Sequence, residues 1–175
     1  MRLFIAINFD EKTIAEIGKI RDDLHSKASA GRFTRDDNLH LTLVFLGEVD
    51  EALIPAIRHA MNLVSVEPFI LLFSSIGFFK REDGQIWWVG IEPNPMLIEI
   101  HSFLSKRLAE AGFAIEKRKY TPHLTLGRSI RLKTKPEKII SPFKYQANSI
   151  SLMKSENING KTTYTAIYEK TLKNG

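Results

Sequence analysis

The chain has 175 residues, of which 43% are hydrophobic and 26% charged, a composition typical of one globular domain and not of a disordered chain, a collagen or a coiled-coil rod. Because it contains no cysteine, a disulfide framework, a cysteine nucleophile and a thiolate metal site are excluded. The net charge of +5 comes from the C-terminal part, since residues 101–175 hold 15 Lys and Arg against 5 Asp and Glu, whereas residues 1–100 hold 10 against 15. A basic part of this kind is typical of proteins with an anionic partner such as nucleic acid, although solvated surface lysines give the same count.

The hydrophobic pattern predicts about eight strands and three helices. In chain order the elements are a strand at 2–9, a helix from 10 to about 25, a loop at 27–35, a strand at 39–46, a helix at 50–64, strands at 69–79 and 85–91, a helix at 94–112, short strands at 113–116 and 124–128, a loop at 130–142, and strands at 143–153 and 162–172. Asp10 and Asn94 are suitable N-caps for the first and third helices.

Hairpins and helices alternate along this order, which favours an antiparallel or mixed α+β sheet over a doubly wound parallel one. No Pro- or Ser-rich linker divides the chain. We therefore expect a single domain over residues 1–175, built from two intertwined lobes.

One tetrapeptide occurs twice. His40-Leu41-Thr42-Leu43 recurs 83 residues later as His123-Leu124-Thr125-Leu126. Since side chains alternate between the faces of a strand, each copy places its histidine and threonine on one face and its two leucines on the other. The repeat predicts two related halves about a pseudo-twofold axis, in which antiparallel sheets line a central groove and helices lie outside.

Two imidazoles across one groove suit general acid–base catalysis near neutral pH, since one can be neutral and accept a proton while the other is charged and donates one. The threonines can donate hydrogen bonds to non-bridging oxygens. Such a set fits in-line substitution at phosphorus. A single copy would be read as an ordinary strand with a polar face, but sheet packing does not explain histidine at both matched places.

The other histidines, His25, His59 and His101, lie on predicted helices without a partner motif, and we expect them to be structural or surface residues. No HExxH motif or cysteine set is present, so no metal is expected. Basic residues that flank the second motif could follow RNA phosphates or form a solvated surface; they are Lys117, Arg118, Lys119, Arg131, Lys133 and Lys135.

The paired motifs resemble the two-histidine (2H) phosphoesterase superfamily, and within it the RNA 2′,3′-cyclic phosphodiesterases, long called 2′–5′ RNA ligases. The resemblance covers nearly the whole chain. Its supporting segments are Arg2 to Ala6, Asn38 to Gly47, Gly77-Phe78-Phe79, Trp87, Thr121 to Arg128, Ser155 and Gly160 to Tyr164.

The resemblance implies hydrolysis of a 2′,3′-cyclic phosphate at an RNA end to a 2′-phosphate, without a metal or other cofactor. It implies that His40 donates a proton to the 3′-oxygen and that His123 accepts one from water. It also implies four substrate-binding residues. The phosphate is held by Thr42, Thr125 and Arg128, and the terminal base stacks on Phe45.

Strand geometry raises a question about two of these residues. Phe45 and Arg128 each follow their histidine by five positions, and an odd separation places them on the leucine face of an ideal strand. To reach the groove, the strand must end, twist or bulge first. Gly127 makes this easy for Arg128, whereas nothing local does so for Phe45, which is otherwise a core aromatic.

Several alternatives stay open. The chain could cleave a small cyclic or 2′–5′-linked nucleotide, bind RNA without catalysis, or run the same chemistry in reverse as a 2′–5′ ligase. No GxxxxGK[ST] loop is present, which argues against use of ATP. The first apolar run is too short for a signal peptide or a membrane span, so we expect a cytoplasmic protein, and a monomer.

Overall fold

The computed structural model describes residues 1–173, which form three α-helices and nine strands. The helices are α1 (Glu11–Ser26), α2 (Ile54–Asn62) and α3 (Pro95–Glu110). The strands are β1 (Arg2–Asn8), β2 (Ala28–Phe33), β3 (His40–Glu48), β4 (Phe69–Arg81), β5 (Gly84–Ile91), β6 (His123–Leu132), β7 (Ile139–Ala147), β8 (Ser149–Ile158) and β9 (Lys161–Thr171). Short 3₁₀ turns, η1 (Asp36–Asn38) and η2 (Glu51–Leu53), precede β3 and α2.

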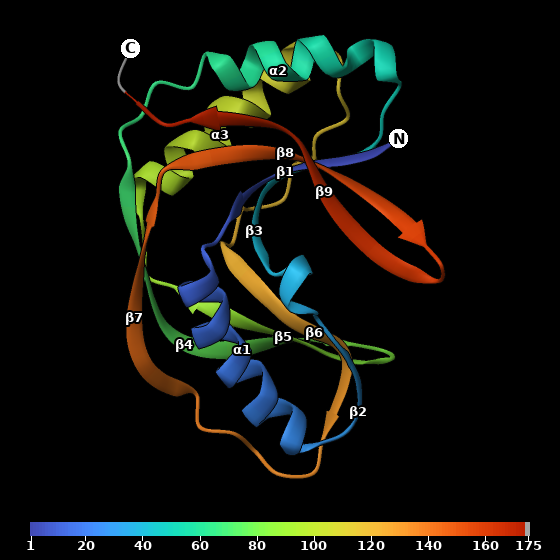
Figure 1. Ribbon diagram of the computed structural model, residues 1–175, viewed down its shortest axis with the longest axis vertical. Helices are drawn as coiled ribbons and strands as arrows, with labels where there is room; N and C mark the ends of the chain where they lie inside the picture. Colours follow the sequence, from blue (N-terminus) through green and yellow to red (C-terminus); the bar gives the residue numbers. More distant parts are fainter. Residues whose placement is uncertain (174–175) are drawn as a thin grey trace.

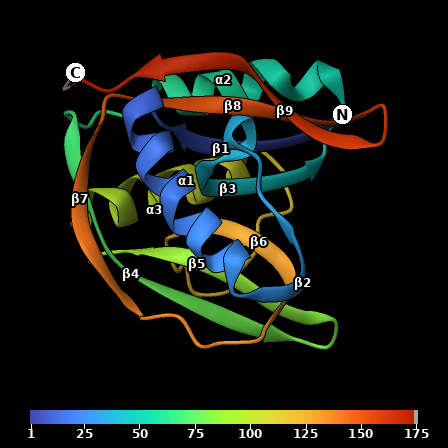
Figure 2. The same ribbon diagram turned by 60° about the horizontal axis from the view of Figure 1, so that its bottom comes forward.

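The strands form two antiparallel sheets, a four-stranded one in the order β3-β1-β8-β9 and a five-stranded one in the order β2-β6-β5-β4-β7. Helix α1 follows β1 of the smaller sheet but lies along the larger one, where it contacts β2 (Figures 1 and 2). Helix α3 follows β5 of the larger sheet but contacts β3 of the smaller one. The α+β class and the antiparallel sheets predicted from the sequence are therefore confirmed, and the chain crosses repeatedly between the two sheets.

Capping and apolar spacing explain where the helices form. The Asp10 carboxylate accepts a hydrogen bond from the Thr13 backbone N–H at 2.8 Å, and the Asn94 side chain accepts one from the Leu97 N–H at 3.1 Å. Both caps agree with the sequence prediction. The predicted apolar face of α1 is buried at Ile17 and Leu24.

One hydrophobic cluster contains side chains from both sheets and all three helices. The four leucines of the two motifs belong to it, and each is at most 2% exposed: Leu41, Leu43, Leu124 and Leu126. The predicted leucine face of each motif strand is thus confirmed.

Four predicted segments differ from the structure. Residues 28–33, predicted as loop, form the edge strand β2, whose side chains are mostly exposed and so have no apolar alternation. Residues 113–116, predicted as a strand, have no regular structure. The predicted loop 130–142 includes the end of β6 and the start of β7. The predicted strand 143–153 is interrupted at Asn148, where the chain passes from the larger sheet to the smaller one.

Within residues 1–173, no helix combines the length and the apolar composition that a bilayer crossing requires.

Candidate active site

Each sheet carries one copy of the repeated motif. The first copy begins β3 of the four-stranded sheet, and the second begins β6 of the five-stranded sheet, and these two strands contact each other. In both copies the histidine and threonine are partly exposed while the leucines are buried. The topology therefore brings the two polar faces together, as the repeat predicts.

The repeat extends beyond the tetrapeptide to a shared irregularity. In the β1–β3 ladder Ala6 pairs with Thr42 and Ile5 with Val44, so Leu43 is skipped. In the β5–β6 ladder Trp88 pairs with Thr125 and Trp87 with Gly127, so Leu126 is skipped. A β-bulge thus follows each motif threonine, and a bulge shifts the alternation of faces by one residue.

These bulges explain how Phe45 and Arg128 can lie on the same face as the histidines although each follows its histidine by an odd number of residues. From histidine to the sixth position, both strands show the same order of partly exposed, buried, partly exposed, buried, buried and exposed side chains. Phe45 and Arg128 hold the exposed sixth position, and both line the same pocket as Thr42 and His123. Phe45 is 45% exposed, so its interpretation as a core aromatic is wrong.

Only the second bulge has a local sequence cause. A Cβ atom at Gly127 would lie 2.8 Å from the backbone oxygen of Arg32 on the neighbouring strand β2, so only glycine allows this close approach. The first bulge contains Val44 at the equivalent position, and no residue there requires it.

The two catalytic candidates are held in the same way. His40 Nδ1 lies 2.7 Å from the backbone oxygen of Asn38, and His123 Nδ1 lies 2.6 Å from that of Thr121. Because a carbonyl oxygen only accepts, each Nδ1 carries a hydrogen, and in the neutral ring Nε2 is left with its lone pair. His40 Nε2 is 3.0 Å from the Thr42 hydroxyl. In both rings Nε2 is therefore the atom available for proton transfer.

Burial is the main cause that lowers the pKa of both imidazoles below their ordinary value, although the hydrogen bond at Nδ1 opposes it. The positive charge of Arg128 lowers both pKa values further. His123 adds to the effect on His40, and Arg118 adds to the effect on His123. The effect of Arg128 on both rings agrees with a site that gathers the two histidines around this guanidinium, and an anion bound there would raise both pKa values.

A pocket of about 380 Å³ opens at this place. Four of the six predicted site residues line it, namely Thr42, Phe45, His123 and Arg128. His40 and Thr125 do not line it: His40 lies beside Thr42, and Thr125 lies on the same face of β6 as His123. The structure thus brings four of the predicted residues into the lining of one cavity and leaves two outside that lining.

Around His40 the structure gives a supporting role to residues that the sequence analysis named only within the segments that carry the resemblance. The buried Asn38 side chain donates to the Thr162 carbonyl at 2.8 Å and accepts from the Tyr164 backbone N–H at 3.2 Å. The His40 ring packs against Phe4 and Tyr164, with centroid distances of 4.8 and 5.1 Å. Strands β1 and β9 therefore fix the orientation of this imidazole.

A second set of supporting residues joins the two motifs. Tyr120 Oη donates to the Thr42 carbonyl at 2.9 Å, and His101 Nδ1 donates to the Leu43 carbonyl at 2.8 Å. Their rings are stacked, with centroids 3.9 Å apart. Burial raises the pKa of Tyr120 strongly, so its hydroxyl stays a donor. His101, expected to be structural or on the surface, thus supports the first bulge and also lines the pocket.

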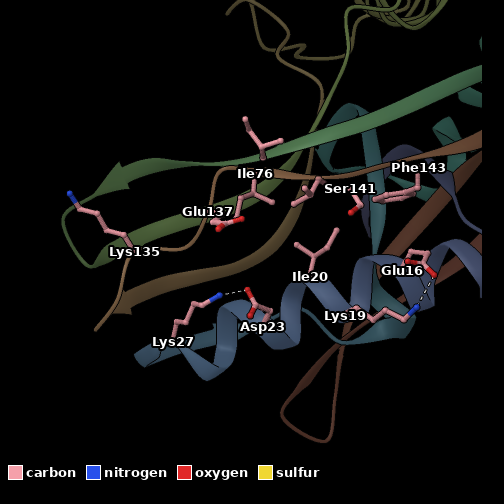
Figure 3. A pocket seen from close by; sticks show the side chains of 12 residues that line it. Glu16, Lys19, Ile20, Asp23, Lys27, Ile76, Lys135, Glu137, Ser141 and Phe143 are labelled. Atoms are coloured by element: carbon pink, nitrogen blue, oxygen red, sulfur yellow. Dashed lines mark hydrogen bonds and ion pairs between the residues drawn. The ribbon is translucent and has the colours of Figure 1, made fainter.

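A second cavity, of about 600 Å³, lies between α1 and strands β4 and β7 (Figure 3). Ile20 of α1 points across it toward Ile76 of β4. Two of its lysines are already paired, Lys19 with Glu16 at 2.8 Å and Lys27 with Asp23. It contains none of the motif residues, so the candidate active site is the smaller pocket.

Within residues 1–173, no group of three or more His, Asp and Glu side chains is arranged to hold a metal ion.

Comparison with known proteins agrees with this geometry. The family model of the 2′-5′ RNA ligase superfamily matches residues 9–158. The RNA 2′,3′-cyclic phosphodiesterase of Thermotoga maritima is 31% identical over 98% of this chain and 93% of its own length, and that of Methanocaldococcus jannaschii is 34% identical over 97% and 99%. The crystal structure of Escherichia coli LigT complexed with 3′-AMP superposes with a TM-score of 0.88 at 28% identity, over 98% of this chain and 97% of that one. The paired motifs, the two-sheet fold and these matches together show that the chain belongs to the 2′-5′ RNA ligase superfamily.

Proposed function

We propose that the chain hydrolyses the 2′,3′-cyclic phosphate at the end of an RNA and leaves a 2′-phosphate. The observation that carries the proposal is the duplicated histidine geometry, in which both rings are held through Nδ1 and keep Nε2 for proton transfer. The relatives named RNA 2′,3′-cyclic phosphodiesterase support the reaction type.

The proposal gives each site residue one role. His40 protonates the leaving 3′-oxygen and His123 takes a proton from the attacking water, on opposite sides of the phosphorus. Thr42, Thr125 and Arg128 bind the non-bridging oxygens, where charge develops in the transition state. Phe45 stacks on the terminal base, and its exposed ring at the pocket supports this role.

The reaction needs no metal in this proposal. RNA ending in a 2′,3′-cyclic phosphate should yield the 2′-phosphate at the same rate with and without EDTA, as measured by separating the two monophosphate isomers. If EDTA abolishes turnover and a divalent ion restores it, the two-histidine mechanism does not apply. A 3′-phosphate product would mean that the other phosphorus–oxygen bond breaks.

The charge of Arg128 should set the pH range in which the protein is active. The kcat/KM profile should be bell-shaped: protonation of His123 lowers the rate at acid pH, and deprotonation of His40 lowers it at alkaline pH. Because the charge of Arg128 lowers both pKa values, Arg128→Gln should raise both and move the whole bell to higher pH.

Arg128→Lys separates geometry from charge. A lysine keeps the positive charge but cannot bind two phosphate oxygens with a planar fork, so the rate should fall about tenfold while the bell stays in place. Arg131→Lys on the same strand is the matched control, since Arg131 does not line the pocket. Equal rates for the two lysine variants would remove Arg128 from phosphate binding.

A small cyclic or 2′–5′-linked nucleotide is a second candidate substrate. LigT of Escherichia coli has been crystallised with 3′-AMP and with phosphate, which are small ligands. Ligation uses the same residues on the same cyclic phosphate: a 5′-hydroxyl attacks the phosphorus in place of water, His123 takes its proton, the bond to the 3′-oxygen breaks with a proton from His40, and a 2′–5′ diester forms. The single-domain organisation, the monomeric state and the cytoplasmic location stay predictions from the sequence.

A further inference from the structure

We propose that the active-site pocket binds a second phosphate of the substrate, the diester that precedes the terminal nucleoside, through Arg81 and Lys119. The proposal rests on the proposed function and deepens it, because it makes an oligonucleotide the substrate in preference to a free nucleoside cyclic phosphate.

The first argument is the surplus of charge. Four cationic side chains line the pocket, Arg81, Arg118, Lys119 and Arg128, against the one carboxylate of Glu116. A 2′,3′-cyclic phosphate carries a single negative charge, which Arg128 alone can balance. Gathering further cations in one cavity costs free energy unless more negative charge enters with the ligand.

The second argument is which of these cations are already paired. Arg118 Nε lies 2.9 Å from the Glu116 carboxylate, so this pair is internally neutral. Arg81 and Lys119 make no ion pair with any residue that the structure describes, 1–173. In the larger cavity, by contrast, Lys19 and Lys27 are both paired. The larger cavity also has one cation without an ion pair in the described part of the chain, Lys135, whereas the smaller site pocket has Arg81 and Lys119 in addition to Arg128.

The third argument is position. Arg81 lies two residues after Phe79 on β4, on the same face, and Phe79 contacts the His123 ring edge-on at 5.1 Å. Lys119 lies two residues before Thr121, whose carbonyl holds His123. Both cations thus line the same cavity as His123 of the second motif, within reach of a ligand that extends beyond the phosphate at Arg128.

The structure also divides the basic residues that flank the second motif. Arg118 and Lys119 line the pocket, whereas Lys117, Arg131 and Lys133 do not. Lys135 lines the other cavity. Their count in the sequence therefore overstates the number that can contact a substrate in the site.

The test compares adenosine 2′,3′-cyclic phosphate with the dinucleotide ApA that ends in the same cyclic phosphate. For the wild-type protein, kcat/KM for the dinucleotide should exceed that for the mononucleotide by a factor of about ten or more. The double variant Arg81→Ala/Lys119→Ala should lose this preference and retain cleavage of the mononucleotide. The matched control Arg131→Ala/Lys135→Ala should keep the preference.

A dinucleotide with a neutral methylphosphonate linkage separates charge from base stacking. The methylphosphonate dinucleotide should be cleaved with the same kcat/KM as the mononucleotide. In addition, the plot of log kcat/KM against log salt concentration should be steeper for ApA than for the mononucleotide, by about 0.7 per phosphate contact. The proposal is overturned if the neutral dinucleotide keeps the preference, if the double variant keeps it, or if the double variant cleaves both substrates equally poorly. Absence of cleavage of both substrates by the wild-type protein would instead refute the proposed function.

Discussion

Alanine at either motif histidine should nearly abolish turnover. Each Nε2 atom has a distinct task, and a general acid or base contributes about 10²- to 10⁴-fold to rate. We therefore expect His40→Ala and His123→Ala each to lower kcat by that factor, measured by release of the 2′-phosphate from an RNA with a cyclic end. Substrate affinity should change far less, since Arg128 and the threonines remain.

The control is His59→Ala, because His59 is exposed on α2 and makes no contact with either motif strand that the structure records. It should retain wild-type rate. Because both histidines act in one transition state, the double variant should be little slower than the slower single variant. A rate near wild type for either single variant would remove that histidine from the mechanism.

The sequence alone was sufficient to predict those elements and residues whose position depends on a pattern in the chain itself. Apolar spacing and the Asp10 and Asn94 caps located the helices, and period-two alternation located the buried leucines of both motifs. The motif histidines were found because they occur twice in one setting. Each of these signals can be read directly along the chain, either as a local pattern or as an identical repeat.

The rest depends on pairing between distant segments. The bulge at Leu43 is defined by the register between β3 and β1, and no residue type next to Leu43 predicts a bulge. Strand β2 was missed because an exposed edge strand needs no apolar alternation. Tyr120 and His101 reach the first motif strand across 78 and 58 residues, and no spacing rule connects them with it.

The duplicated bulge also shows how two similar halves acquire different tasks. The same backbone position, five residues after each histidine, presents a phenyl ring in one half and a guanidinium in the other. In the proposed function the first binds a base and the second a phosphate. The asymmetry of the substrate is thus matched by side chains on a shared backbone geometry, and the two histidines should be asymmetric as well.

A substrate in which sulfur replaces the 3′-oxygen tests that asymmetry. An alkoxide leaving group needs a proton because the pKa of its alcohol is close to that of water, about 15.7, whereas a thiol has a pKa of about 8.5 and leaves as the thiolate. The sulfur substrate should therefore restore most of the rate lost in His40→Ala and little of that lost in His123→Ala, which lacks the base for water. Single-turnover rates of both variants on both substrates measure this. Rescue of His123→Ala alone would exchange the two roles, and rescue of neither would mean that another group protonates the 3′-oxygen.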